Sequence, residues 1–224
     1  MRLKKIFFAL ICVFFITQGF SQRKFPPNSY NRLGVQGALT YGNIYSEDFT
    51  FIDRYGFSAG FATRATAGKK IFFIYGVNFY QFNTSMETLS FRTFEPEEID
   101  FKATGVQINF FVGHKLIGEN LSLEGGPVLQ INSKLSPEEG KEGYLLKEYD
   151  LVALDLEDIS RMNFSVAAGL SGGLPGVKLW VQYQYGLSNL FSKLNYEELR
   201  EKDPTITSFK GNMRMALVGA VIYF

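Results

Sequence analysis

The sequence predicts an all-β fold, an eight-stranded antiparallel up-and-down transmembrane β-barrel with long extracellular loops. Three observations predict it. A short secretory signal precedes the rest of the chain, apolar residues alternate with polar or small ones in eight segments, and the connections between these segments are alternately long and short. Together these features are typical of a protein that is exported and then folds in the bacterial outer membrane.

The first 21 residues have the three parts of a secretory signal peptide. Basic residues within 1–5 precede an apolar run at 6–16, and small residues around Ser21 supply a cleavage site. The run is about half of the roughly 20 residues that a membrane-spanning helix needs. Cys12 lies inside the run and does not follow a small residue, so a lipoprotein signal is not predicted. The mature chain would contain no cysteine for disulfide or thiolate chemistry.

The predicted domain organisation has three parts: a signal peptide at 1–21, a short periplasmic segment at 22–29 and an outer-membrane barrel at 30–224. The signal contains three of the 23 basic residues and none of the 22 acidic ones, which leaves the mature chain with a net charge of −2. It lacks the basic excess that nucleic-acid binding normally requires, so no nucleic-acid partner is expected. The 23 Phe and 12 Tyr residues are too many for a disordered chain.

The alternation is clearest at 177–188, where the sequence is V-K-L-W-V-Q-Y-Q-Y-G-L-S. Successive side chains of a strand point to opposite sides of a sheet, so six large apolar residues lie on one side and six mostly polar or small ones on the other. Seven further segments show the pattern with varying clarity, and in the last of them neither face is clearly polar. The predicted strands are 32–41, 56–64, 71–82, 104–112, 121–132, 162–173, 177–188 and 212–224.

Composition indicates which face of these strands points outward. One face is made of Gly, Ala, Ser, Asn and Gln with few charges, whereas a water-facing surface would contain Lys, Glu and Arg. We therefore place this face in a narrow polar lumen and the large apolar face against lipid. A soluble barrel with the opposite arrangement is the alternative, because periodicity alone does not identify the outer face.

The connections support the membrane interpretation. Four are predicted to be long and three to be short, as in outer-membrane barrels, which have long extracellular loops and short periplasmic turns. This alternation predicts that both termini lie on the periplasmic side. Of the 22 acidic residues, only Glu119 and Glu124 lie outside the long segments. The long connections are 42–55, 83–101, 133–159 and 189–211, with helices expected at 144–158 and 195–202; the short ones are 65–70, 113–120 and 174–176.

Four charged residues fall on the predicted inner face, near the periplasmic ends of their strands: Arg32, Arg64, Glu124 and Lys178. A carboxylate among several bases in a confined lumen is favourable, whereas an unpaired charge there is costly. The alternative is that one or more of these long side chains reaches the membrane interface. Because side chains largely fill an eight-stranded barrel, we expect a plugged lumen and no diffusion channel.

The sequence resembles the small outer-membrane β-barrel proteins of Bacteroidota, the PorT-like family, and more distantly the OmpX- and OmpA-type barrels. The residues behind this resemblance are the signal ending in Ser21-Gln22, the Gly- and aromatic-rich alternation, and a terminal strand that closes on Tyr223-Phe224. The resemblance implies that Phe224 and Ile222 form part of a signal for the barrel-assembly machinery. Large apolar residues at Met215, Leu217 and Val221, in the other phase of this strand, depart from that pattern.

No catalytic, cofactor-binding or metal site is predicted. His114 is the single histidine. It lies next to a predicted periplasmic turn, far from the extracellular rim where small outer-membrane enzymes combine His with Ser, Asp or Glu. A lone histidine at a strand end is typical of an interface residue, and no segment has the spacing of a calcium-binding loop. The sequence therefore favours a non-enzymatic protein without a cofactor.

Two hypotheses about function follow. The first is a structural or accessory barrel whose long acidic loops contact other outer-membrane proteins or components of a secretion complex, since these loops exceed what strand reversal needs. The second is a barrel that binds a lipid or another hydrophobic ligand, either in the membrane or as a soluble periplasmic carrier. Membership in a secretion complex is implied by the family resemblance alone.

Overall fold

A computed structural model of the protein describes residues 31–147, 149–174, 176–194, 199, 202–203 and 208–224. The predicted signal peptide, the segment 22–29 and the first residue of the predicted barrel lie outside the described residues.

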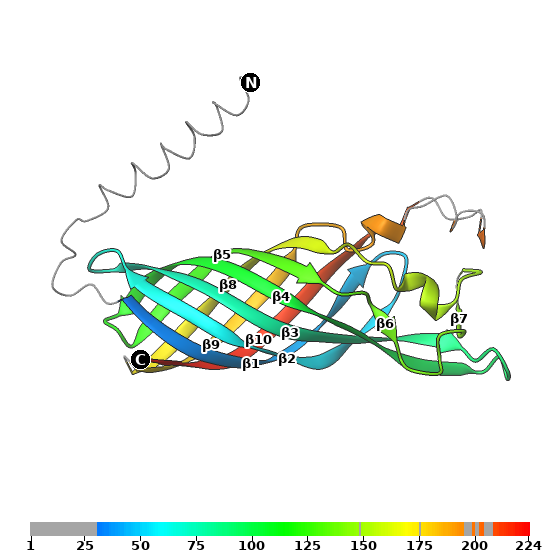
Figure 1. Cartoon of the computed structure of the whole chain (residues 1–224), viewed down its shortest axis with the longest axis horizontal. Coiled ribbons are helices and arrows are strands. Elements are labelled where there is room, and N and C mark those ends of the chain that lie inside the picture. The colour runs from blue at the N-terminus through cyan, green and yellow to red at the C-terminus, as the bar shows by residue number, and fades with distance from the viewer. Residues whose placement is uncertain (1–30, 148, 175, 195–198, 200–201, 204–207) are drawn as a thin grey trace, which may run out of the picture. The chain divides into compact units, whose positions relative to one another are not determined.

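Eight long antiparallel strands form a closed ring (Figure 1). Each strand pairs with its neighbours in the chain, and the last strand pairs with the first from Gly34↔Tyr223 to Ser46↔Gly211. The predicted eight-stranded antiparallel barrel is therefore confirmed. The strands are β1 (Asn31–Ser46), β2 (Phe51–Thr66), β3 (Ile71–Leu89), β4 (Pro96–Ile117), β5 (Leu121–Asn132), β8 (Met162–Leu174), β9 (Val177–Gly186) and β10 (Gly211–Tyr223).

The outer face of the ring is apolar. In β9, the side chains of Leu179 and Tyr183 are 67% and 51% exposed, whereas Lys178 and Gln184 on the opposite face are 2% and 3% exposed. The same phase holds along β8, where Phe164 points outward and Asn163 inward. A soluble barrel has the reverse arrangement, so this belt of outward apolar side chains identifies a membrane-spanning barrel.

No helix in the described part of the chain has the length and hydrophobicity needed to cross a bilayer.

The strands are longer than predicted at one end, so the predicted bounds of the first two long connections are wrong. Strand β1 ends at Ser46 and β2 begins at Phe51, and a six-residue turn joins β3 to β4. The predicted strands ended where the inward residues stop being polar. Beyond that level the inward residues are apolar, as Ile44 and Phe51 show, and the strands continue because these side chains enter a core.

The four connections that follow β1, β3, β5 and β9 lie at the same end of the barrel, which we call the loop end. The other three connections and Phe224 lie at the opposite end, which we call the turn end (Figure 1). The third connection contains two short strands, β6 (Ser136–Pro137) and β7 (Leu145–Leu146), and a 3₁₀ turn, η1 (Ala153–Leu156). The fourth contains η2 (Ser192–Leu194). The helix predicted at 144–158 is thus wrong except for η1, because its first residues pair with a strand edge. Most of the helix predicted at 195–202 falls outside the described residues.

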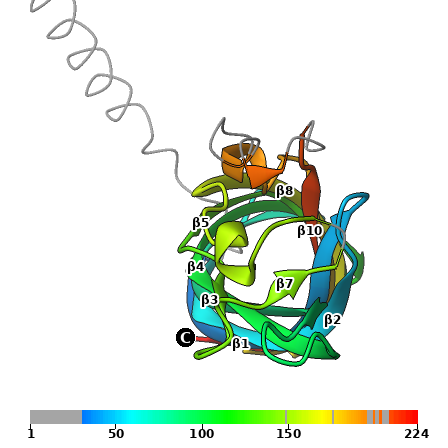
Figure 2. The same cartoon turned by 90° about the vertical axis from the view of Figure 1, so that its right-hand side faces the viewer.

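The loop end is closed by a hydrophobic core. In the view along the barrel, β7 and the helical turn that follows it lie across the mouth (Figure 2). Their side chains pack with inward residues of the strands and with the fourth connection, so this core joins loops and barrel wall into one unit. It consists of Ile44, Phe49, Phe51, Tyr80, Phe82, Met86, Ile99, Phe101, Ala103, Leu135, Leu146, Leu151, Ala153, Leu156, Ile159, Leu190, Phe191, Leu194, Phe209, Met213, Met215 and Leu217.

A smaller apolar cluster fills the barrel nearer the turn end. It includes Phe72 and Phe111, both buried inside the ring. Gly113 makes room for it, because a Cβ atom at this position would lie 2.0 Å from Cζ of Phe72. The lumen is therefore packed with side chains and is not an open tube.

Candidate functional site

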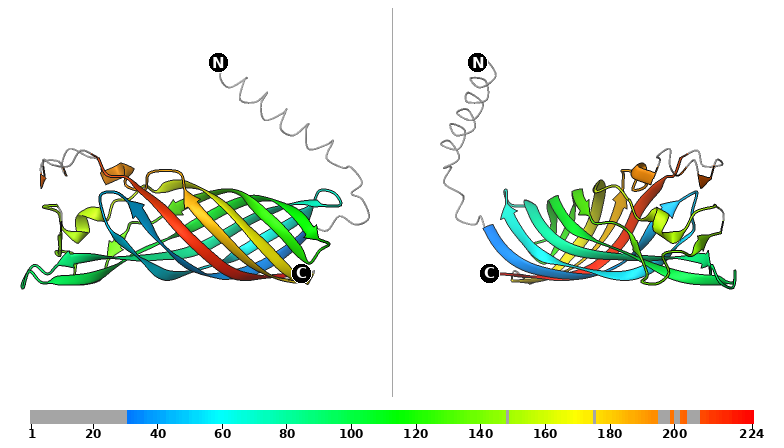
Figure 3. Two further views of the ribbon diagram at one scale, coloured as in Figure 1. Left: turned by 180° about the vertical axis from the view of Figure 1, so that it is seen from behind. Right: turned by 45° about the vertical axis from the view of Figure 1, so that its right-hand side comes forward.

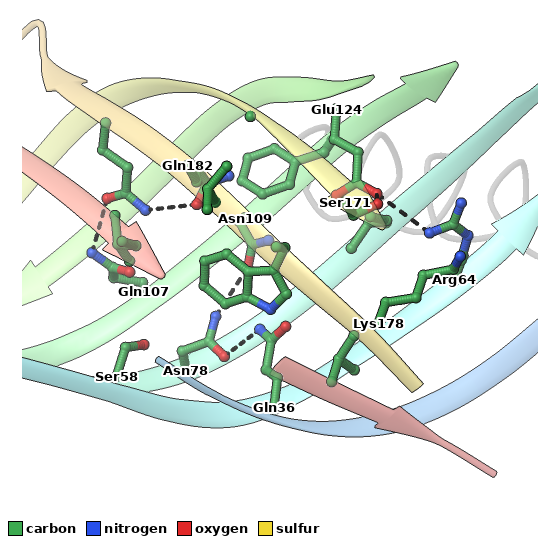
Figure 4. Close-up of a pocket in the computed structure, with 18 of the residues that line it drawn as sticks. Gln36, Ser58, Arg64, Asn78, Gln107, Asn109, Glu124, Ser171, Lys178 and Gln182 are labelled. Atoms are coloured by element: carbon green, nitrogen blue, oxygen red, sulfur yellow. Dashed lines mark hydrogen bonds and ion pairs between the residues drawn. The ribbon is translucent and has the colours of Figure 1, made fainter. Parts of the chain in front are cut away.

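The polar part of the lumen begins with an ion pair near the turn end (Figure 4). Nη1 of Arg64 lies 3.3 Å from Oε1 of Glu124, and Nη2 donates a hydrogen bond of 3.1 Å to Oγ of Ser122. The hydroxyl of Ser171 also donates to Glu124. The side chains of the pair are only 7% and 11% exposed, so each charge depends on the other for its compensation.

The other two bases of the predicted cluster have different surroundings. Lys178 is buried and donates a hydrogen bond to the backbone carbonyl of Glu119, in the turn between β4 and β5. Arg32 lies directly opposite Arg64 in the β1–β2 register. The structure thus brings Arg64 to Glu124, while the hydrogen bond of Lys178 goes to the turn.

Sequence reasoning missed Lys115 and Glu119, which form a second ion pair at this end of the lumen. Lys115 is buried, and Glu119 belongs to the turn that also receives Lys178. The sequence contains the information needed to predict that Lys115 points inward, because Lys115 lies on the same face of the strand as Gln107 and Asn109. It was missed because the predicted strand ended at 112, whereas β4 continues to Ile117.

Aromatic packing holds the Arg64 guanidinium in place. Its Cζ atom lies 3.5 Å from the centre of the Phe72 ring, which is fully buried. A cation over an aromatic face is stabilised most where water is excluded. Phe72 thus adds to the interactions that fix Arg64 beside Glu124.

Side-chain amides continue the polar network through the middle of the barrel (Figure 4). Gln36 donates to Asn78 at 2.6 Å, and Asn78 donates to Asn109 at 3.2 Å. Gln107, on the same strand as Asn109, donates to Gln184 of β9 at 3.2 Å. Buried side-chain amides are stable in the lumen only when they form hydrogen bonds with each other. The strands β1, β3, β4 and β9 supply the donors and acceptors of these bonds.

The space that remains inside the lumen is too small for a ligand. The cavity beside these amides has a volume of about 40 Å³. A water molecule needs roughly 10–15 Å³ of such space, whereas ligand pockets measure about 300–1,000 Å³. This cavity can hold a few waters at most and is too small for a ligand.

The other residues singled out in the sequence lie on the outside. His114 is exposed on β4 near the turn end, opposite Ile71 of β3 and Leu123 of β5. Phe224 and Ile222 are 74% and 59% exposed and point outward. In the described part of the chain, no three His, Cys, Asp or Glu side chains come together as a metal site.

The second candidate site is the hairpin of β3 and β4, which extends beyond the other strands at the loop end (Figure 3). The third connection supports both of its edges. Strand β7 pairs with β3 at Thr88↔Leu146, and β6 pairs with β4 at Phe101↔Pro137. Pairing on both sides satisfies backbone groups that a projecting hairpin would otherwise expose, and it holds the hairpin in one orientation.

Glu97 of β4 links this hairpin to the third connection. Its carboxylate lies 2.9 Å from Nζ of Lys141 and accepts a hydrogen bond of 3.1 Å from the hydroxyl of Tyr144. Lys141 also pairs with Glu138 at 3.0 Å. The hydrogen bond from Lys141, helped by the one from Tyr144 and by the charge of Lys141, lowers the pKa of Glu97.

The tip of the hairpin exposes two aromatic side chains. Phe91 is 48% exposed and contacts the ring of Tyr144 edge-on, at 6.0 Å between ring centres. Phe94 is 65% exposed and has a φ of 55°, a left-handed conformation that a bulky residue rarely adopts. The tip thus combines two exposed aromatic side chains with a backbone conformation that is unfavourable for a bulky residue.

No protein-family model matches the sequence, and a search of curated proteins found no match. Among solved structures, the chain is similar to Neisserial surface protein A, with 14% identity, a TM-score of 0.49, and coverage of 86% of this chain and 97% of that one. It is also similar to Ail, the attachment invasion locus protein of Yersinia pestis, in complex with the heparin analogue sucrose octasulfate, with 14% identity, a TM-score of 0.46, and coverage of 87% and 99%. A second structure of Ail has 16% identity, a TM-score of 0.43 and the same coverage. The assignment of the fold rests on the strand topology described above.

The lumen ion pair leads to a prediction about stability. Replacing Glu124 with Gln leaves the Arg64 guanidinium buried without its carboxylate, so the free energy of unfolding should fall by about 3–5 kcal/mol. Urea unfolding in detergent micelles, followed by heat-modifiable gel mobility, measures this loss. Glu139→Gln, in the exposed third connection, is the matched control, and replacing Arg64 and Glu124 together with Leu should recover much of the loss. A Glu124→Gln variant as stable as the control would contradict the role of the pair.

The lowered pKa of Glu97 leads to a prediction about pH. A carboxyl group with a lowered folded-state pKa stabilises the folded state above its ordinary pKa of 4.5, and this contribution is lost as the pH falls through the lower folded value. Glu97→Gln should therefore speed amide hydrogen exchange at 138–147 at neutral pH, and its difference from the wild type should vanish in acid. Glu95→Gln, at the exposed tip, is the control. An equal effect of both substitutions would show that Glu97 does not anchor the third connection.

Proposed function

We propose that this chain is a non-enzymatic outer-membrane barrel that acts as a structural or accessory component, presenting its loop end outside the cell as a docking surface for another membrane protein or a component of a secretion complex. The supported β3–β4 hairpin, with Phe91 and Phe94 exposed at its tip, is the observation that carries this proposal. In this orientation the loop end is extracellular and both termini are periplasmic, which the length of the third and fourth connections supports.

The order of the loop end supports docking. Conformational freedom opposes the ordering of a long loop by about 1–2 kcal/mol per residue, so loops that only reverse the chain are commonly short or mobile. Here the third connection has its own backbone pairing to β3 and β4, and its apolar side chains enter the loop-end core. A surface that is ordered before binding loses less entropy when it meets its partner.

The chemistry of the surface indicates what the partner offers. Residues 87–100 and 133–161 contain 13 acidic and five basic residues. Several of the carboxylates surround the aromatic tip, including Glu95, which is exposed, and Glu87, which pairs with Lys147 at 2.7 Å. The complementary surface is therefore an apolar pocket for Phe91 and Phe94 with basic residues at its rim.

The alternative function, a barrel that binds a lipid or hydrophobic ligand, has weaker support. The lumen cavity of about 40 Å³ is too small for such a ligand. A larger cavity of about 260 Å³ lies at the loop end, between the β1–β2 turn and β7, with Phe49, Ile52, Met86 and Leu146 in its wall. It also contains Asp48, Glu87 and Lys147, and its volume is below the usual range for a ligand pocket.

Two further roles are part of the proposal. Phe224 and Ile222 are recognised by the barrel-assembly machinery during insertion, which their outward orientation on the last strand supports. The charges of Arg32, Arg64, Glu124 and Lys178, with Lys115 and Glu119, close the turn end of the lumen. The buried Arg64–Glu124 pair, the Lys115–Glu119 pair and the hydrogen bond of Lys178 to the turn support this. Membrane lipid is the constant partner of the outer apolar belt.

Photo-crosslinking in intact cells tests the docking role. A photoreactive residue at position 94 should give a crosslinked adduct with a cell-envelope protein whose contacting segment is basic. The same residue at Leu154, which is 46% exposed on η1 of the third connection and not on the hairpin, is the control.

The substitution Phe94→Asn separates docking from folding. Asn tolerates the left-handed conformation at this position, so the variant should be at least as stable as the wild type. It should nevertheless reduce recovery of the crosslinked partner, with the photoreactive residue now at 91, by about tenfold, as expected for the loss of an aromatic anchor. Unchanged recovery, or equal crosslinking at 94 and 154, would contradict the docking role.

A further inference from the structure

The guanidinium of Arg214 lies at the loop-side edge of the outer apolar belt. Arg214 of β10 belongs to the outward phase of its strand, between the paired residues Asn43 of β1 and Tyr185 of β9. Toward the turn end, all the outward residues of this strand are apolar: Ala216, Val218, Ala220, Ile222 and Phe224. Exposed tyrosines at the same edge, such as Tyr41 and Tyr55 with ring centres 5.0 Å apart, mark the level of the membrane interface.

Two aromatic rings hold this guanidinium. Its Cζ atom lies 3.6 Å from the centre of the Tyr45 ring and 5.4 Å from the centre of the Tyr185 ring. Tyr45 and Tyr185 come from the strands on either side of β10. Closure of the barrel places Tyr45 there, and the pairing of β9 with β10 places Tyr185. The side chain is half-buried between these neighbours, which fixes its direction before any ligand binds.

The guanidinium of Arg214 has aromatic contacts, but no anionic partner within the described part of the chain. Arg214 takes part in none of the ion pairs found among the described residues. Its Nε atom is buried and has no hydrogen-bond acceptor. Other bases near this edge differ: Arg54 pairs with Asp100 at 3.3 Å, and Lys134 pairs with Glu157 at 3.1 Å. A positive charge left without an acceptor at a membrane surface is costly unless an anion arrives from outside.

We propose that Arg214, held by Tyr45 and Tyr185, binds the phosphate group of a lipid in the leaflet at the loop end. Guanidinium groups bind phosphate through paired hydrogen bonds, and their planar shape suits stacking on aromatic rings. The site opens sideways into the membrane, directly above apolar residues that acyl chains can contact. A lipid therefore contacts both the guanidinium, through its phosphate, and the apolar residues, through its acyl chains. A free phosphate ion contacts only the guanidinium. This inference depends on the membrane-spanning fold and is independent of docking at the hairpin tip.

Native mass spectrometry of the protein in dodecyl maltoside micelles, titrated with lipid A that contains two phosphates, tests the site. Arg214→Gln should bind this lipid about tenfold more weakly than the wild type, which corresponds to 1.4 kcal/mol. Arg214→Lys should be intermediate because it keeps the charge but not the planar group. Tyr45→Leu, which retains the charge but removes a ring, should also weaken binding, and it replaces Arg214→Gln if that variant fails to fold. Lys102→Gln, an exposed base near the same edge, is the matched control.

Two further ligands distinguish the source of the phosphate. Lipid A without its phosphates should bind the wild type about as weakly as intact lipid A binds Arg214→Gln. Inorganic phosphate, added at the same phosphate concentration, should not displace the intact lipid. The proposal is overturned if Arg214→Gln binds intact lipid A as well as Lys102→Gln does, if the phosphate-free lipid binds equally well, or if inorganic phosphate displaces the lipid.

Discussion

The structure depends on one constraint, the closure of the sheet by hydrogen bonds between β1 and β10. Lipid offers backbone amides no partner, so a membrane-spanning sheet must satisfy all of them within the ring. Closure of only eight strands makes the ring narrow, and its inward residues then have to satisfy each other. The Arg64–Glu124 pair and the amides around Asn78 do so within the membrane level. Closure also brings Tyr45 of β1 beside Arg214, on the side of β10 opposite to Tyr185 of β9.

The polarity of the inward residues changes along the barrel, and this change explains why the connections at the loop end are ordered. Within the apolar belt the inward residues are mostly polar, because the lumen there is small and charges or amides pair across it. Beyond the belt, the inward residues are apolar, and the third and fourth connections pack against them. The strands therefore continue outside the membrane as part of a hydrophobic core like that of a soluble domain. This core holds the β3–β4 hairpin and its exposed Phe94 in a fixed position.

Most membrane-level strands could be predicted from the sequence because large apolar residues alternate in them with polar or small ones. The rule is weakest in β10, whose inward residues Met215, Leu217 and Val221 are also apolar. The strand extensions could not be predicted, since the rule changes beyond the belt: Ile44 and Phe51 are apolar and point inward. The alternation predicts that Arg64, Glu124 and Lys178 point inward, and all three are largely buried. It contains no information on which of them pair. The inward position of Lys115 was not predicted, because the predicted strand ends at 112 and β4 continues to Ile117. The contact of Arg214 with Tyr45 could not be predicted, because it depends on the register between the first and last strands. The alternation of residues along each strand does not specify that register.

Spin-label accessibility along β9 tests the central claim, an apolar outside and a filled polar inside, most directly. Labels are placed one at a time from 178 to 184 in protein inserted into phosphatidylcholine bilayers. Accessibility to oxygen, which concentrates in lipid, should be high at 179, 181 and 183 and low at 178, 182 and 184, with little access for a water-soluble nickel complex at any of them. The opposite phase, or access of the nickel complex to the even positions, would contradict the account.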